Sequence, residues 1–162
     1  MNIFVLDEEP DVAAQMLCDY HLRKMCVETA QILSGVMLRR GIALLDGMPK
    51  PQNINHPVIV AAASATDATN WTCFYFFFIL REFHIRFGKH HKYFAIFPLY
   101  FDTLLGIDLS DDHTKLAKCC GDLDVSGLDI VTAYLKYYTE VKKPQLQAKG
   151  LWHFTKIKDW TI

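Results

Sequence analysis

The chain contains 162 residues, of which 51% are apolar and 22% charged, and its formal net charge is -1 with the seven histidines taken as neutral. A chain of this size and composition is typical of one globular domain with a substantial core, so we expect a single domain over residues 1–162. The near-zero charge excludes a globally basic nucleic-acid-binding protein, although a local basic face is enough to bind a polyanion.

The cysteines and the first residues indicate a reducing compartment. There are five cysteines and no CxxC pair, which argues against a disulfide framework and a structural zinc site. The opening "MNIFVLDEEPD" has no basic region of the kind that starts a signal peptide. The most apolar run spans only ten residues between Asn70 and Arg81, about half of a membrane span. We therefore expect a cytoplasmic protein that does not enter a membrane.

The first third of the chain predicts one strand and two helices. Asn2–Leu6, "NIFVL", favours β structure and predicts a short N-terminal strand. A first helix is predicted over Pro10–Leu17, because proline suits the first helical position. Asp19 then caps a second helix, which reaches about Arg40 and ends at the glycine that follows.

A loop and a long helix follow. Asp46–Pro57 carries three prolines and several amide side chains, which predicts a loop. From Val58 to about Phe87 the pattern predicts helix, with a break near Thr66 and an end at Gly88. Residues 89–113 show no clear period.

The last part of the chain predicts turns, a helix and a tail. Cys119–Gly127 is rich in turn-forming residues, and Leu128–Val141 predicts an aromatic-rich helix. A basic C-terminal tail is predicted from about residue 141. The fold class is therefore mainly α: a compact, single-domain helical fold with one short N-terminal strand.

Four polar residues form a stripe along the second predicted helix. His21, Lys24, Glu28 and Gln31 fall on one side at about 100° per residue. A base, an amine, a carboxylate and an amide are the groups that proton transfer or a Schiff-base step requires. The alternative is a solvated face in which Lys24 and Glu28 form an ordinary i,i+4 salt bridge. His56, beside a predicted helix start, is either part of an anion site or a helix cap.

The densest basic segment is Arg81–Lys92, "REFHIRFGKHHK". Glu82 and Arg86 are spaced i,i+4 on a core-facing edge, where charges are costly unless they are paired or used. Arg86, Lys89 and His91 are candidate phosphate ligands; the alternative is that cations simply complement the dipole at a helix C-terminus. Glycine-rich phosphate loops and HExxH-type metal motifs are absent from the sequence, so we expect no metal and no cofactor.

The segment Cys18–Gln31, "CDYHLRKMCVETAQ", resembles a group of small phage-encoded proteins that open with a strand and then read CD-x-H-x-x-K-M-x-x-E-x-A-Q. Later parts of that group are similar to "HPVIVAAASATDATNW", "EFHIRFGKHH" and "AYLKYYTEVKK" of this chain. The similarity covers most of the sequence. It implies a phage protein located in the host cytoplasm.

More remotely, the order of these motifs is similar to the pyrimidine-dimer DNA glycosylases, which are small α-helical enzymes. In that family the N-terminal amine forms a Schiff base with the sugar C1′, a glutamate on an early helix assists, and basic residues hold a kinked duplex. The resemblance implies that Glu28 is the catalytic carboxylate and His21 the early histidine. The nucleophile is then the amine of Met1 or, alternatively, that of Lys24. Gln31 stands where the family carries an arginine.

Three functions remain open from the sequence. The first is an enzyme that acts on a nucleic-acid base or nucleotide, such as a DNA glycosylase/lyase-like hydrolase that cleaves an N-glycosidic bond. The second is a non-enzymatic protein that binds a nucleotide or nucleic acid, and the third is a protein-binding phage accessory (anti-defence) factor. The predicted catalytic residues are Glu28, His21, Lys24 and Met1, and the predicted substrate- or phosphate-binding residues are Gln31, His56, Glu82, Arg86, Lys89 and His91.

Overall fold

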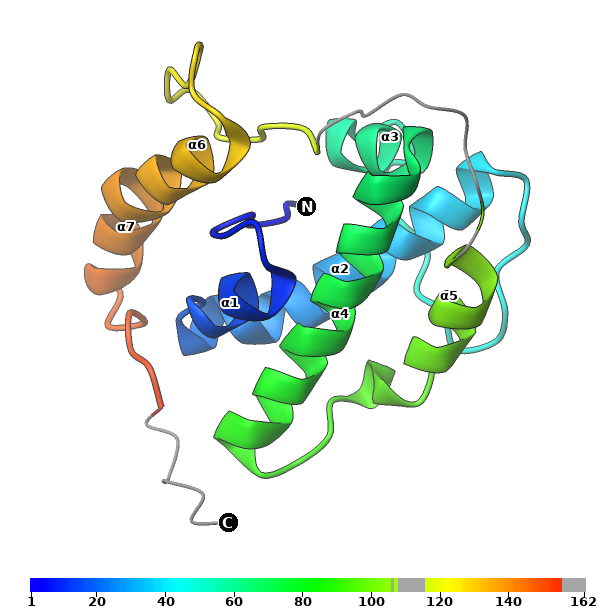
Figure 1. Ribbon diagram of the computed structural model, residues 1–162. Coiled ribbons are helices and arrows are strands. Elements are labelled where there is room, and N and C mark those ends of the chain that lie inside the picture. The colour runs from blue at the N-terminus through cyan, green and yellow to red at the C-terminus, as the bar shows by residue number, and fades with distance from the viewer. Residues whose placement is uncertain (106, 108–115, 156–162) are drawn as a thin grey trace.

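The computed structural model describes residues 1–105, 107 and 116–155 (Figure 1). These residues form α1 (Pro10–Gln15), α2 (Asp19–Arg39), α3 (Pro57–Ser64), α4 (Thr66–Phe87), a 3₁₀ turn (Lys92–Phe94), α5 (Phe97–Leu104), α6 (Ile130–Tyr137), a π-helical turn (Tyr138–Lys142) and α7 (Lys143–Gln147). The prediction of a mainly α-helical protein is confirmed. None of the helices in the described part of the chain is both long and apolar enough to cross a bilayer.

The predicted N-terminal strand is wrong. Residues 2–6 are not assigned to any strand, and no strand occurs among the described residues. Ile3, Phe4, Val5 and Leu6 are each at most 3% exposed. An apolar, β-favouring run can bury itself between helices as well as in a sheet, and here helices surround it. Figure 1 shows this segment passing between α4 and α6.

The helix boundaries follow local signals in the sequence. The predicted break near Thr66 is confirmed, because Ala65 adopts an extended conformation (φ -139°, ψ 144°) between α3 and α4. Gly88 closes α4 at φ 65°, a left-handed conformation that costs glycine little. The Asp129 side chain accepts a 2.9 Å hydrogen bond from the Thr132 N–H and so caps α6.

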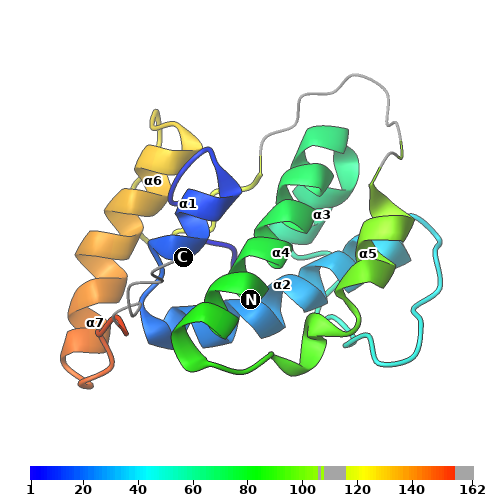
Figure 2. The same cartoon turned by 60° about the horizontal axis from the view of Figure 1, so that its bottom comes forward.

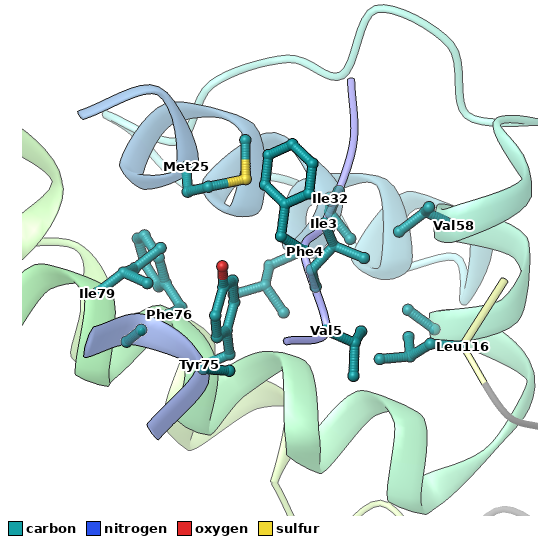
Figure 3. Close-up of a cluster of buried hydrophobic side chains, with 14 of the residues drawn as sticks. Ile3, Phe4, Val5, Met25, Ile32, Val58, Tyr75, Phe76, Ile79 and Leu116 are labelled. Atoms are coloured by element: carbon teal, nitrogen blue, oxygen red, sulfur yellow. The ribbon is translucent and has the colours of Figure 1, made fainter. Parts of the chain in front are cut away.

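The core lies where α2, α3 and α4 pack together. Figure 3 shows Met25 and Ile32 of α2 facing Tyr75, Phe76 and Ile79 of α4, with the N-terminal segment between them. The helices α2 and α3 approach closely at Gly35, where an added Cβ would lie 2.5 Å from Cδ1 of Ile59.

The last predicted helix is longer than expected, because α6, the π-helical turn and α7 follow one another without a break from Ile130 to Gln147. Residues 151–155 then return to the start of α2, where the Asp19 N–H donates to the His153 carbonyl over 3.0 Å. The predicted basic tail is therefore helical at first and then packs against the start of α2. Figure 2 shows α6 and α7 in line beside the remaining helices.

Candidate active site

The α-amine of Met1 lies beside the carboxylate of Glu28. Met1 N is 3.7 Å from Glu28 Oε1, and the Asn2 N–H donates to Oε2 over 3.0 Å. The Met1 side chain is 3% exposed, but the residue as a whole is half-buried, so its exposed surface lies on its main chain. The chain therefore brings its first amine to the carboxylate on which the sequence pattern centres.

Lys24 supplies a second amine at the same carboxylate oxygen. Its Nζ lies 3.4 Å from Glu28 Oε1, and the two residues have the i,i+4 spacing of a helix salt bridge. The Lys24 side chain is 48% exposed whereas that of Glu28 is 11% exposed. The predicted salt bridge is confirmed, and it has a third member, Met1, which is distant in the sequence.

His56 sits close enough to this group to be affected by its charges. Its Nδ1 accepts a 3.3 Å hydrogen bond from the Val58 N–H, so the predicted cap of α3 is confirmed. Burial lowers the pKa of His56, the positive Met1 amine lowers it further, and the negative Glu28 partly opposes this. The His56 imidazole therefore presents an unprotonated Nδ1 to the start of α3, and its pKa responds to the charges of Met1 and Glu28.

Gln31, half-buried and one turn beyond Glu28, ties α2 to the loop before α3. Its Nε2 donates to the Lys50 carbonyl over 3.5 Å.

Cys119 also lies at this site, although no sequence pattern indicated it. Its carbonyl accepts a 2.9 Å hydrogen bond from Asn2 Nδ2. Burial raises the pKa of the half-buried thiol, while the Val58 N–H and the Met1 amine partly counteract the rise. We refer to Met1, Lys24, Glu28, His56 and Cys119 as the amine site.

His21 does not belong to the amine site. Its side chain is buried against Phe4, and its Nδ1 lies 3.1 Å from the Tyr138 hydroxyl. Burial, followed by the positive charges of Lys24 and Lys142, lowers its pKa to about 4. A neutral, enclosed imidazole of this kind stabilises the fold, so the surroundings of His21 favour a structural role over the predicted catalytic one.

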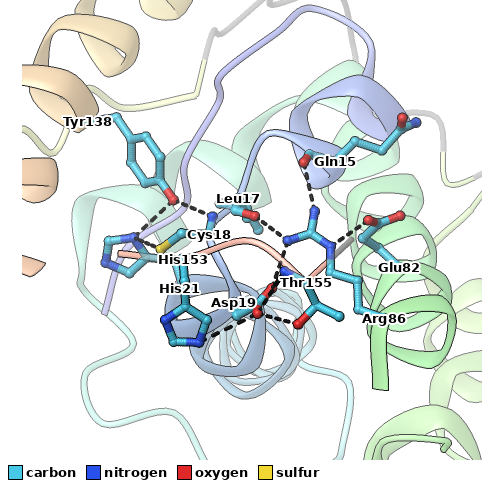
Figure 4. Close-up of polar contacts among 10 residues, drawn as sticks. All are labelled: Gln15, Leu17, Cys18, Asp19, His21, Glu82, Arg86, Tyr138, His153 and Thr155. Carbon is cyan, nitrogen blue, oxygen red and sulfur yellow. Dashed lines mark hydrogen bonds and ion pairs between the residues drawn. The ribbon is translucent and has the colours of Figure 1, made fainter. Parts of the chain in front are cut away.

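Glu82 and Arg86 form a buried ion cluster (Figure 4). Arg86 Nε donates to Glu82 Oε1 over 2.7 Å, and Nη1 lies 3.2 Å from Asp19 Oδ1. The other bonds go to the carbonyls of Leu17 and Gln15 at 2.6 and 2.7 Å. Because the guanidinium is committed to protein acceptors and the Arg86 side chain is 4% exposed, its geometry favours a structural role over the predicted phosphate contact.

Asp19 does not cap α2 as predicted, because it is the first helical residue and Cys18 occupies the N-cap position without a side-chain capping bond. Its carboxylate accepts from both the N–H and the hydroxyl of Thr155, at 3.0 and 2.6 Å from Oδ2. Burial raises the pKa of Asp19, but the hydrogen bonds from Thr155 and Arg86 outweigh this effect and lower it overall. No sequence pattern indicates Thr155 as its partner, since the two residues are 136 positions apart.

Lys89 and His91 follow the end of α4, and the buried ion cluster is formed by other residues. Lys89 is exposed, whereas His91 is half-buried and accepts a 3.3 Å hydrogen bond from the Tyr93 N–H. Burial and the neighbouring Lys92 lower the pKa of His91. The predicted site residues are therefore not all part of the amine site.

In the part of the chain that the structure describes, no group of three or more His, Cys, Asp or Glu side chains is placed to hold a metal ion. No protein-family model, curated protein or solved structure matches this chain.

Proposed function

We propose that this protein is an enzyme that acts on a nucleic-acid base or nucleotide, with an amine as the nucleophile and Glu28 as the acid/base. The observation that supports the proposal is the placement of the Met1 amine 3.7 Å from a largely buried carboxylate. An amine attacks an electrophilic carbon only after losing a proton, and an adjacent carboxylate can accept it.

The chemistry is that of N-glycosidic cleavage. The amine nitrogen forms a bond to the sugar C1′, the bond from C1′ to the base breaks, and the base leaves with the electron pair and a proton. The nitrogen then loses its remaining proton and forms a double bond to C1′, while the bond from C1′ to the ring oxygen breaks and that oxygen takes up a proton, which gives an open-chain imine. Glu28 would relay these protons, and Lys24 Nζ lies 3.4 Å from the same carboxylate oxygen as the amine.

Met1 is the preferred nucleophile. An α-amine loses its proton more readily than a lysine amine. The Met1 amine is also fixed by the contacts of the next residue, whereas the Lys24 side chain is 48% exposed.

A second surface supports a nucleic-acid substrate. The rings of His84 and His90 stack at 4.2 Å, His90 and Phe94 lie 4.4 Å apart, and Arg23 lies over Phe87 at 4.3 Å. We call these residues, together with the exposed Lys89, the α4-end surface. Glu82 is the single acidic residue in the sequence from 81 to 101, and it is buried in the ion cluster.

Flat rings interleaved with cations bind bases by stacking and phosphates by charge. Arg23 of this surface directly precedes Lys24 of the amine site, and both are exposed on α2. The same surface would serve a non-enzymatic nucleic-acid-binding protein, which is the second candidate function.

The test is borohydride trapping on an oligonucleotide with an abasic site. Intact mass first establishes that the purified chain carries an unblocked Met1. We expect a reduced adduct that peptide mapping locates at Met1. Lys24→Arg keeps the charge but removes the competing amine, and this variant should still be trapped.

The outcomes separate the candidate functions. An adduct on Lys24 alone would show that Lys24, and not Met1, is the nucleophile. Absence of any adduct, together with salt-sensitive binding of the oligonucleotide, would favour the non-enzymatic candidate. Absence of both the adduct and oligonucleotide binding would favour the third candidate, a protein-binding factor.

A further inference from the structure

Asn2, the residue next to the amine, uses every polar group of its side chain. Its Nδ2 donates to the Cys119 carbonyl over 2.9 Å. Its Oδ1 accepts from the Ile3 N–H at 2.8 Å and from the Tyr134 hydroxyl at 3.1 Å. Its main-chain N–H meanwhile donates to Glu28. Four contacts therefore fix the orientation of this one residue.

Tyr134 connects this residue to α6. The side chain is fully buried, and its hydroxyl lies 2.9 Å from the Ala117 carbonyl and accepts from the Cys119 N–H at 3.1 Å. Burial raises the pKa of Tyr134, so the hydroxyl keeps its proton for donation. The hydroxyl shares its single proton between Asn2 Oδ1 and the Ala117 carbonyl and accepts from the Cys119 N–H, so its removal ends these contacts but leaves the ring in place.

These contacts have a direct consequence for the amine. With Asn2 held by Glu28 on one side and by Cys119 and Tyr134 on the other, the Met1 amine keeps only rotations within its own residue. We propose that Asn2 and Tyr134 are positioning residues that hold the Met1 amine against Glu28, so that α6 controls the placement of the nucleophile. The catalytic meaning of this placement rests on the proposed function, whereas the placement itself can be measured without substrate.

The test compares two variants in which a buried tyrosine is replaced by phenylalanine. Tyr134→Phe removes the hydroxyl that holds Asn2. Tyr138→Phe removes a similarly buried hydroxyl that accepts from the Cys18 N–H at 2.9 Å and lies beside His21 but has no bond to Asn2. The probe is formaldehyde with cyanoborohydride, which methylates free amines, and peptide mapping gives the rate at Met1 over the neutral and mildly alkaline range.

We expect Tyr134→Phe to change the Met1 methylation rate about 2- to 10-fold, the factor that corresponds to one lost neutral hydrogen bond, and to alter its pH profile. Tyr138→Phe should leave both at the wild-type values even if it lowers the melting temperature as much. Equal changes in the two variants, or no change in either, would overturn the proposal.

A second variant keeps the test available if Tyr134→Phe does not fold. Asn2→Leu removes the bonds to Cys119 and Tyr134 at a half-buried position, and a side chain of this size does not favour removal of Met1, so the variant should change the Met1 rate in the same direction. An unchanged rate would again overturn the proposal. A changed rate together with no trapping on abasic DNA would retain the positioning role and reject the proposed enzyme.

Discussion

The guanidinium of Arg86 lies 3.2 Å from the carboxylate of Asp19, and the two side chains are only 4% and 2% exposed. Since Arg86 is on α4 and Asp19 begins α2, this pair joins the two longest helices. The pair is not isolated, because Glu82 shares the arginine and Thr155 shares the aspartate. Through these contacts the Arg86 guanidinium links α1, α2 and α4 directly, and it is linked through Asp19 to the segment that follows α7.

Replacing Arg86 should therefore affect stability before it affects binding. Arg86→Ala leaves two buried carboxylates without their cation, and we expect a loss of about 3–5 kcal/mol in the free energy of unfolding. Arg86→Lys should recover only part of this, because an ammonium cannot reach all of the acceptors at once. Urea denaturation measures both variants, with the exposed Arg81→Ala as the control. A small loss with Arg86→Ala would show that the cluster contributes little.

Stability should fall with acid in the range where His21 titrates. The folded-state pKa of His21 is lowered to about 4 from 6.5, so the unfolded chain binds the extra proton first. The contribution of the neutral ring is complete above pH 6.5 and is lost as the pH falls towards 4. His21→Gln should flatten this part of the curve of melting temperature against pH. An unchanged slope in His21→Gln would contradict this account.

Gly35 is predicted to tolerate no side chain while Ile59 is present. In Gly35→Ala the new Cβ would lie 2.5 Å from Cδ1 and 2.8 Å from Cγ2 of Ile59. We expect a loss of about 1–3 kcal/mol from overpacking. The double variant with Ile59→Ala should lose less than the sum of the two single changes, because the clash is gone. Strict additivity in urea denaturation would show that α2 and α3 separate freely.

Glu28→Gln should remove the trapped adduct and leave the fold intact. The amide oxygen can still accept from the Asn2 N–H, but it cannot take a proton from the amine. We expect the melting temperature to stay within a few degrees of wild type while the trapping rate falls at least about 100-fold, the lower range for loss of a general base. A large fall in melting temperature with trapping retained would mean that Glu28 has a structural role.

Lys89→Ala should weaken the binding of single-stranded DNA and reduce its dependence on salt. Each lost phosphate contact lowers the slope of log affinity against log salt by about 0.7 for a single strand. Lys149→Ala is the control, since Lys149 is equally exposed but follows α7. Equal effects from both lysines would show that binding does not occur at the α4-end surface.

The sequence predicts the helices well because their start and stop signals are local. The same holds for the pair formed by Lys24 and Glu28 and the pair formed by Glu82 and Arg86, each of which has i,i+4 spacing. Helical spacing cannot distinguish a cleft from a core, however. The polar stripe on α2 therefore suggested one role for His21 and Glu28. In the structure His21 lies in a buried aromatic cluster, whereas Glu28 belongs to the amine site.

Other contacts lay beyond sequence reasoning because their partners are far apart in the chain. Asp19 meets Thr155, and Asn2 meets Cys119 and Tyr134. No spacing rule connects such positions. The packing of α6 against the N-terminal segment brings Asn2 to Tyr134, and the return of residues 151–155 to the start of α2 brings Thr155 to Asp19. The strand predicted at residues 2–6 failed for the same reason, since the neighbours of an extended segment decide whether it joins a sheet.

The burial of the N-terminal segment also constrains how the protein is made. Phe4 packs against Tyr134 and Tyr138, with ring centroids 6.3 and 5.1 Å apart. Residues 3–6 are thus covered by side chains that lie about 130 positions later in the chain. Because residues 3–6 are translated long before α6, their apolar side chains lack these partners until that helix is synthesised, and hydrophobic surface exposed in this way is prone to aggregation.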